Sequence, residues 1–175
     1  MLTIGHSTHE LDAFVALLTR HGIEAIADVR RMPASRRMPH FAAASLRVEL
    51  PAAGVGYVHL PELGGFRKPA PDSPNAGWDH RSFRGYADHM ASDEFAAGLA
   101  RLLELADARR TAVMCAEAQW HRCHRRLVSD ALVVRGRRVL HVGSDGRARE
   151  HELTPFAVAD GTDLAYPPSQ TELRL

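Results

Sequence analysis

Short apolar runs alternate with segments of helical periodicity along the chain, and this alternation constrains the fold more than any other feature. The clearest helical segment begins at Asp93 and places Phe95, Leu99 and Leu102 on one face. The apolar runs are residues 2–4, 23–29, 55–60, 111–115 and 139–142. Strands that alternate with helices form βαβ units with right-handed crossovers. We therefore expect an α/β fold, a single three-layer domain with a mostly parallel sheet of about five strands and helices on both faces.

Composition and charge narrow the class of protein. The chain has 175 residues, of which 45% are hydrophobic and 25% charged, and its formal net charge is +1. This is typical of one globular domain without an overall field that would attract nucleic acid or a membrane. No apolar run is long enough to span a membrane, and two cysteines are too few for a disulfide framework. Since the first apolar helical segment already carries charged residues, we expect no secretory leader. We expect a soluble cytoplasmic protein, with an α/β domain over residues 1–156 and a poorly ordered polar tail over residues 157–175.

Polar residues gather where the expected strands end. Ligands of open α/β sheets bind beyond the carboxyl ends of the strands, near a topological switch point. The sequence therefore predicts one site, to which four strand ends contribute. The strand-end groups are Gly5-His6-Ser7, Asp28 with Arg30, Gly64-Gly65, and Cys115 with Glu117.

The first group, Gly5-His6-Ser7, precedes a helix. Ser7 and Glu10 have the spacing of a capping box, and a helix N-terminus attracts anions. A neutral imidazole at such a place transfers protons near pH 7. We expect Gly5 and Ser7 to bind ligand and His6 to be catalytic. A plain turn with a capping serine is the alternative.

The second group adds charged side chains, and the third adds glycines that let a ligand approach the backbone closely. Asp28 and Arg30 share one strand face, so they either present a carboxylate and a guanidinium to a ligand or form a structural ion pair. We take Asp28 as an acid/base candidate and Arg30 as a ligand contact. Ser35, in the proline-rich loop that follows, and the glycines Gly64 and Gly65 are further expected ligand contacts.

The fourth group contains both cysteines of the chain within one loop. Cys115 is either a nucleophile, activated by the basic segment Cys123-His124-Arg125, or a small buried residue. Cysteine phosphatases and sulfurtransferases do not provide the mechanism, because the spacing from Cys115 to Arg122 differs from their loop and no glycine lies between. Cys123, His124 and Arg125 are expected to bind ligand.

Two further interpretations concern the same loop. Glu117 serves either in acid/base catalysis or in an ion pair with Arg122 or Arg125. The thiols and the nearby histidines are also soft or borderline metal ligands, and the two thiols could form a reversible disulfide. However, the Cys-x7-Cys-His spacing differs from the common zinc motifs. We therefore expect no cofactor and no metal.

Taken in order, the motifs resemble the domain-of-unknown-function 488 family over roughly residues 2–155. That resemblance implies a small bacterial or archaeal α/β protein and leaves the reaction open. Pro51 departs from the family pattern, so the helix expected from Ala43 should end early. The segments that carry the resemblance are Thr3 to Ser7, Asp28 to Arg30 with Pro33 and Ser35, Tyr57 to Gly65, Phe83 to Met90, and Cys115 to Glu117 with Cys123 to Arg125.

The functional expectation is an enzyme, a hydrolase or a transferase, that acts on an anionic or phosphate-bearing ligand. Nucleotides or nucleic acid are the favoured class, and no membrane partner is expected. In this interpretation Arg30 and Arg125 hold the anion, together with the first strand-end group. A non-catalytic nucleotide- or nucleic-acid-binding module and a cysteine-based redox or metal-binding protein are the alternatives. The sequence leaves the oligomeric state open.

Overall fold

A six-stranded sheet forms the centre of the computed structural model, which describes residues 1–34 and 37–168. The strand order is β3-β2-β4-β1-β5-β6, in which all neighbours are parallel except β6, which runs antiparallel to β5. The strands of this sheet are β1 (Leu2–Gly5), β2 (Ala25–Asp28), β3 (Gly56–His59), β4 (Thr111–Cys115), β5 (Leu140–Val142) and β6 (Ala148–Glu150).

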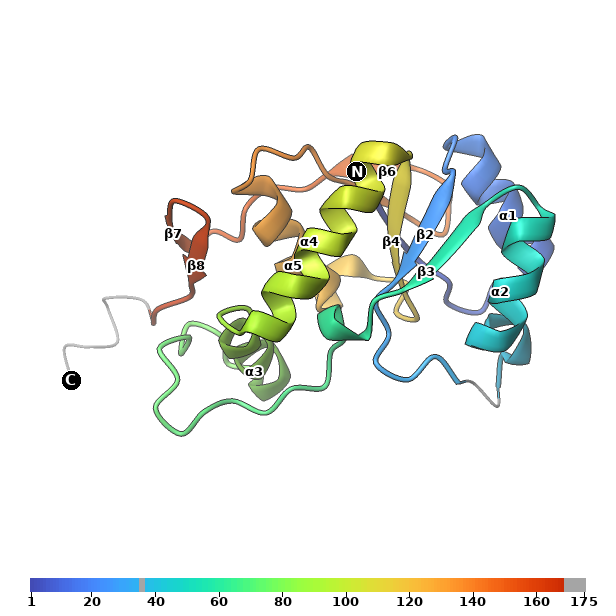
Figure 1. The fold of residues 1–175 in the computed structure, drawn as a ribbon. Helices are drawn as coiled ribbons and strands as arrows, with labels where there is room; N and C mark the ends of the chain where they lie inside the picture. Colours follow the sequence, from blue (N-terminus) through green and yellow to red (C-terminus); the bar gives the residue numbers. More distant parts are fainter. Residues whose placement is uncertain (35–36, 169–175) are drawn as a thin grey trace.

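Helices cover both faces of the sheet (Figure 1). The α-helices are α1 (Leu11–Arg20), α2 (Ala43–Ala52), α3 (Arg81–His89), α4 (Asp93–Ala108) and α5 (Arg125–Val133). Short 3-10 turns are η1 (Pro39–Phe41), η2 (Pro61–Leu63) and η3 (Trp120–Arg122). The predicted α/β class and the mostly parallel sheet are confirmed.

Two apolar cores hold the layers together. Side chains alternate along β4, so that Ala112 and Met114 join the core under α1 and α2, whereas Val113 joins the core under α3, α4 and α5. Leu18 of α1 and Leu102 of α4 are fully buried members of the respective cores. Strands buried on both faces are typical of parallel sheets.

The connections of β1 and β4 create a topological switch point. These two strands are neighbours, but the chain leaves β1 through α1 and returns as β2, beyond β4. It leaves β4 through α5 and returns as β5, beyond β1. The two crossovers therefore diverge in opposite directions on opposite faces, and ligands of open α/β sheets bind near such a point, beyond the carboxyl ends of the strands.

Two helix predictions were wrong in detail. Ser7 and Glu10 do not form a capping box, because α1 begins only at Leu11 and Ser7 has a left-handed backbone with φ of 49°. Pro51 does not shorten α2, which continues to Ala52. Pro51 is exposed and lies in the last turn of this helix, so its missing N–H removes one helical hydrogen bond close to the helix end.

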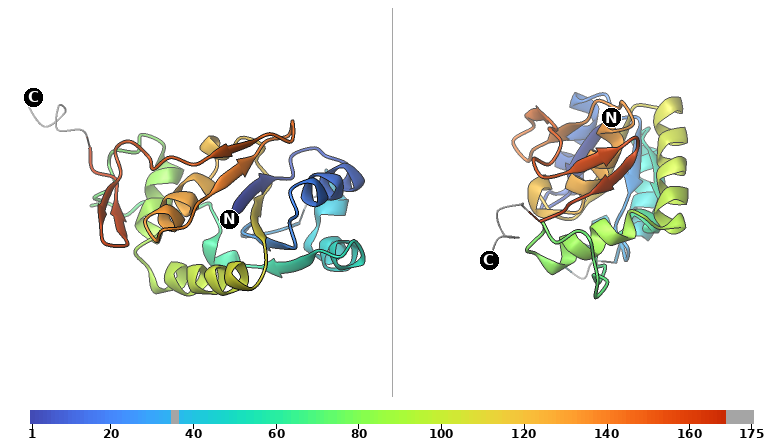
Figure 2. Two further views of the ribbon diagram at one scale, coloured as in Figure 1. Left: turned by 90° about the horizontal axis from the view of Figure 1, so that it is seen from above. Right: turned by 90° about the vertical axis from the view of Figure 1, so that its left-hand side faces the viewer.

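The segment after residue 156 carries more structure than the predicted polar tail. Strands β7 (Val158–Asp160) and β8 (Asp163–Ala165) form a hairpin at the end of the molecule opposite α1 and α2 (Figure 2). Tyr166, which follows, is fully buried and its hydroxyl donates to the Asp130 carboxylate at 2.9 Å. Within the described ranges, no helix is both long and apolar enough to cross a membrane.

Candidate functional site

The chain segments after β1 and β4 meet at the switch point. Gly5 pairs with Cys115 in register, and beyond the strands His6 N donates to Cys115 O at 2.9 Å and Ser7 N donates to Ala116 O at 2.9 Å. A Cβ atom on Gly5 would lie 2.0 Å from the carbonyl oxygen of Glu117, so only glycine fits here. The predicted convergence of the first and fourth strand-end groups is therefore present in the structure.

Asp28 and Arg30 form a buried, bidentate ion pair. Arg30 donates from Nε to Oδ1 of Asp28 at 2.8 Å and from Nη2 to Oδ2 at 2.6 Å. Arg30 also donates to the Phe41 carbonyl at 2.8 Å, and the Tyr57 hydroxyl donates to Asp28 at 2.7 Å. Burial, then the bond to Asp28, raises the pKa of Tyr57. Both charged groups are thus bound within the protein, as the structural-pair alternative requires, and neither presents a free charge to a ligand.

His6 connects this ion pair to the switch point as a neutral imidazole. Its Nε2 lies 3.1 Å from Arg30 Nη1, and its Nδ1 lies 3.0 Å from Ser7 O. A guanidinium only donates, so Nε2 accepts and Nδ1–H donates to the carbonyl. Burial, followed by the charge of Arg30, lowers the pKa of His6 to about 4. Its ring stacks on Phe41 at 4.2 Å, and both nitrogens are engaged, so the geometry gives His6 a positioning contact.

The two thiols and one imidazole form a compact cluster beside this network. One ligand atom each from Cys115, Cys123 and His124 lie within 4.8 Å of one another. Cys123 Sγ is 3.7 Å from His124 Nδ1, and Arg125 Nε donates to the same sulfur at 3.5 Å. The hydrogen bond between the thiols lowers the pKa of Cys123 and raises that of Cys115. Cys123 is buried, whereas Cys115 is half-buried.

Arg125 anchors the loop between β4 and α5. This side chain is fully buried, and its Nη2 donates to the carbonyl oxygens of Glu117 and Ala118. Together with the bond to Cys123, these contacts tie both ends of the loop to one guanidinium. Arg125 therefore holds the thiols in place and does not face solvent, in contrast to the anion-holding role expected from the sequence.

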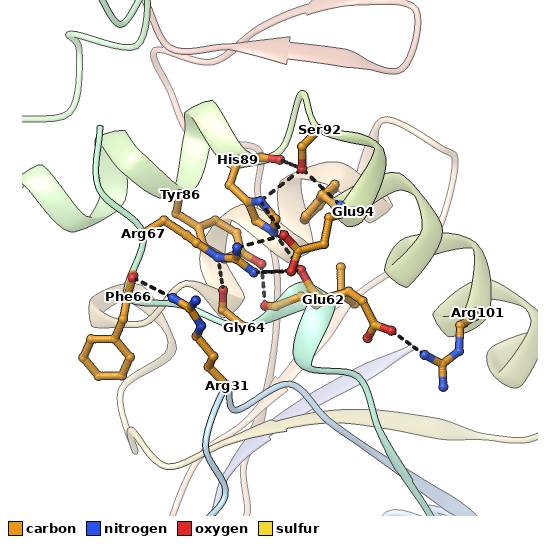
Figure 3. A network of polar contacts seen from close by, with 12 residues as sticks. Arg31, Glu62, Gly64, Phe66, Arg67, Tyr86, His89, Ser92, Glu94 and Arg101 are labelled. Carbon is orange, nitrogen blue, oxygen red and sulfur yellow. Dashed lines mark hydrogen bonds and ion pairs between the residues drawn. The ribbon is translucent and has the colours of Figure 1, made fainter. Parts of the chain in front are cut away.

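The Gly64-Gly65 segment forms a further wall of the cluster, because Gly65 packs directly on His124. Side chains bind three successive carbonyls here, those of Glu62, Leu63 and Gly64 (Figure 3). Tyr86 Oη donates to Leu63 O at 2.7 Å, His89 Nε2 lies 2.7 Å from Glu62 O, and Arg67 Nε donates to Gly64 O at 3.1 Å.

The side chains that bind these three carbonyls, here called the clamp, fix the Gly64-Gly65 segment and thereby set the position of His124. Arg67 is itself held by Glu94 of α4, at 2.9 and 3.0 Å. Gly65, next in the chain, packs so closely on the imidazole that a Cβ atom would lie 2.8 Å from His124 Nδ1. The sequence signal for the clamp is the segment from Phe83 to Met90, which carries the resemblance but to which no site residue was assigned.

Fewer predicted site residues reach solvent than expected. Glu117 is exposed, and its carboxylate accepts from Gln119 N at 3.0 Å. Among the ion pairs of the described residues, none joins Glu117 to Arg122 or Arg125. Ser7 and His124 are half-buried. Ser35 lies outside the described residues, so its predicted ligand contact is not assessed. At this edge Glu117 is therefore exposed, and Ser7, Cys115 and His124 are half-buried, with Nε2 of His124 itself buried.

Two exposed residues near the Gly64-Gly65 wall were missed from the sequence. Phe66 is 89% exposed and has a φ of 61°, a left-handed conformation that is strained for an aromatic residue. Arg31 is exposed and donates to Phe66 O at 3.5 Å (Figure 3). Backbone strain of this kind concentrates at functional sites. Nothing in the local sequence around Phe66 other than the preceding glycines signals this conformation.

The fold and the site together define an α/β protein with a polar constellation at the switch point between β1 and β4. The chain belongs to the family described as domain of unknown function DUF488, whose profile matches residues 10–132. This range contains the Asp28–Arg30 pair and the whole loop from Cys115 to Arg125. Comparisons with curated proteins and with solved structures found no match.

Proposed function

We propose that the switch-point edge is an active site for an anionic, phosphate-bearing ligand, with nucleotides or nucleic acid as the favoured class. The observation that carries this proposal is the meeting of Ser7, Cys115, Glu117 and His124 at the carboxyl ends of β1 and β4. These groups come from three separate segments of the chain, and open α/β sheets bind ligands at this place. A cytoplasmic location belongs to the same proposal, since it keeps both thiols reduced.

Positive charge for the anion comes from exposed arginines in this proposal. Arg30 and Arg125 are committed to internal partners, and their role is to hold the framework rigid. Arg31 follows β2 and Arg122 precedes Cys123, and both side chains are exposed. A guanidinium pairs well with phosphate because its N–H donors match two oxygens at once.

The chemistry assigned to the site is hydrolysis or group transfer. Glu117 is the acid/base candidate, because its carboxylate is exposed at the edge and lies two residues beyond Cys115. Asp28 is withdrawn from that role by its fully buried pair with Arg30. Cys115, half-buried beside Cys123, forms the inner wall at which the reacting group is placed.

A non-catalytic binding module is the second candidate, and one observation favours it. The imidazole of His6 has both nitrogens engaged, so it supplies no free base to the site. Binding without turnover requires only the exposed arginines and the strand-end backbone.

The test is a panel of phosphatase, nuclease and glycosidase substrates, with ligand affinity measured by calorimetry. Wild type is compared with Glu117→Gln and with Glu152→Gln, which alters an exposed carboxylate elsewhere on the surface. Activity that Glu117→Gln abolishes and Glu152→Gln retains supports the enzyme. Affinity for a nucleotide without turnover supports the module, and no affinity for any anionic ligand overturns both.

A further inference from the structure

We propose that Cys115, Cys123 and His124 form a binding site for one thiophilic divalent cation, with Zn²⁺ as the best match. Cysteine sulfur and imidazole nitrogen are the ligands that zinc prefers in proteins. The three side chains offer ligand atoms within 4.8 Å of one another at the switch point.

The distances suit tetrahedral coordination. With Zn–S of about 2.3 Å and Zn–N of about 2.1 Å, a sulfur and a nitrogen on one tetrahedral ion are about 3.6 Å apart. Cys123 Sγ and His124 Nδ1 are separated by 3.7 Å. All three ligand atoms lie within 4.8 Å, so rotations of about 1 Å at the side-chain tips close the set around an ion.

The backbone resolves the difficulty that adjacent ligands present. Neighbouring residues in one regular element point apart, so adjacent residues such as Cys123 and His124 do not ordinarily ligate one ion. Here Cys123 is extended, with φ of −125° and ψ of 149°, whereas His124 is the helical N-cap of α5, with φ of −57° and ψ of −15°. The change of conformation between them turns both side chains toward the same point.

Nδ1 of His124 faces the sulfur of Cys123 at 3.7 Å, so it is the ring nitrogen placed to ligate an ion. Nε2 of the same ring is buried and has no hydrogen-bond partner among the residues that the structure describes, as is also true of His9 Nε2. His6 and His151, by contrast, each have both ring nitrogens engaged in contacts within the protein.

Charge and support are consistent with a cation at this place. Two thiolates balance a divalent ion, and Arg125 donates to Cys123 Sγ from outside the ligand set. The same guanidinium holds the loop carbonyls of Glu117 and Ala118, and Gly65 fixes the imidazole. Ligands are thus held by residues that do not themselves ligate, as in preorganised metal sites.

Three protein ligands leave one position of a tetrahedral ion for water or a ligand. This is the arrangement of catalytic zinc sites, whereas structural sites use four protein ligands. A cation here would attract the oxygen of an anionic substrate to the edge proposed above. The cation site itself does not depend on that proposal, because its ligands and distances stand without any substrate.

The test measures metal directly on the full chain. Wild type purified without chelator is analysed for zinc by elemental analysis, then stripped and titrated with Co²⁺. We expect about one equivalent of zinc and a thiolate-to-cobalt charge-transfer band. Cys115→Ser and His124→Asn should each lower Co²⁺ affinity at least tenfold, whereas His121→Asn, an exposed histidine of the same loop, should leave it unchanged.

Circular dichroism confirms that each variant is folded, and zinc protection of the wild-type thiols against alkylation provides a readout that needs no variant. Absence of both stoichiometric metal and thiol protection in the reduced wild type overturns the site, as does full affinity in folded Cys115→Ser. Zinc bound without any anion affinity leaves the site intact and overturns the proposed function. Anion affinity without bound zinc supports the proposed function and overturns the metal site.

Discussion

The most sharply defined prediction concerns Asp130, a fully buried carboxylate of α5 that ends a chain of hydrogen bonds starting at β1. Thr3 Oγ1 lies 2.7 Å from His141 Nδ1, His141 Nε2 lies 2.9 Å from His151 Nδ1, and His151 Nε2 lies 2.8 Å from Asp130 Oδ1. Trp120 of the cysteine loop stacks on His141 at 3.9 Å. This series of hydrogen bonds therefore supports the loop between β4 and α5, which carries the candidate site.

Asp130→Ala should be strongly destabilising. Three donors lose their acceptor, namely His151, the Thr154 amide at 2.9 Å and the Tyr166 hydroxyl at 2.9 Å. Each hydrogen bond to a charged group contributes about 1.5–3 kcal/mol, and since these three share one carboxylate we expect a total loss of about 4 kcal/mol. For a chain of this size that loss lowers Tm by about 8–16 °C.

Urea denaturation followed by circular dichroism measures the loss. Asp130→Asn keeps one acceptor oxygen and the same shape, so it should lose about 1–2 kcal/mol. Asp72→Ala, which removes an exposed carboxylate, should stay within about 0.5 kcal/mol of wild type. A loss below about 1 kcal/mol in Asp130→Ala would refute the view that this network stabilises the fold.

Three further predictions concern Gly65, Arg125 and the dependence of stability on pH. Gly65→Ala should displace His124 and weaken Co²⁺ binding, with a stability loss of about 1–3 kcal/mol in urea. Arg125→Met should leave buried loop carbonyls unpaired and lower the free energy of unfolding by about 2–4 kcal/mol. Burial, then His151, lowers the pKa of His141 from 6.5 to about 3, so the unfolded chain binds the extra proton. This contribution to stability is complete above pH 6.5 and is lost by up to about 1.4 kcal/mol per unit as pH falls toward 3.

Each of these has a control and a contrary result. Gly136→Ala removes a glycine from an open surface position and should leave Co²⁺ affinity unchanged. Equal loss of Co²⁺ affinity in both glycine variants would contradict the claim that Gly65 holds His124 in place. An exposed arginine, changed as Arg81→Met, should be neutral beside Arg125→Met. Flat stability from pH 6.5 down to pH 4 would contradict the assignment of a neutral buried His141.

The sequence was sufficient for the fold class because buried parallel strands are continuous apolar runs. It was not sufficient for β6, whose three residues are all exposed and carry no alternating pattern. That strand exists because it pairs with β5. The hairpin β7–β8 is likewise exposed on most residues, and its link to the domain depends on Tyr166 reaching Asp130, which is far away in the chain.

The location of the candidate site was predictable, whereas the roles of its residues were not. Strand ends of a parallel sheet meet at one edge, so the meeting of Gly5 with Cys115 followed from the strand pattern. Whether an arginine faces a ligand depends on its partners. Arg30 is bound by Asp28 and by the Phe41 carbonyl, and Arg125 by carbonyls in a loop whose shape no local pattern specifies.

The start of α1 shows the same limit. The Ser7–Glu10 spacing favoured a capping box, but the backbone after β1 continues to pair with the segment after β4. This tertiary pairing delays the helix to Leu11 and places Ser7 in a left-handed conformation. Local capping preference is worth about 1 kcal/mol, so pairing between two strands readily overrides it.

A crystal soaked with inorganic pyrophosphate shows where on the protein a phosphate-bearing anion binds. We predict density at the carboxyl ends of β1 and β4, in contact with Ser7 or the Cys115–Glu117 segment and with an exposed arginine such as Arg31. A rival hollow lies at the opposite, amino ends of the strands, lined by Arg109 and Arg110. An anion bound only there, with none at the switch point, would contradict the account.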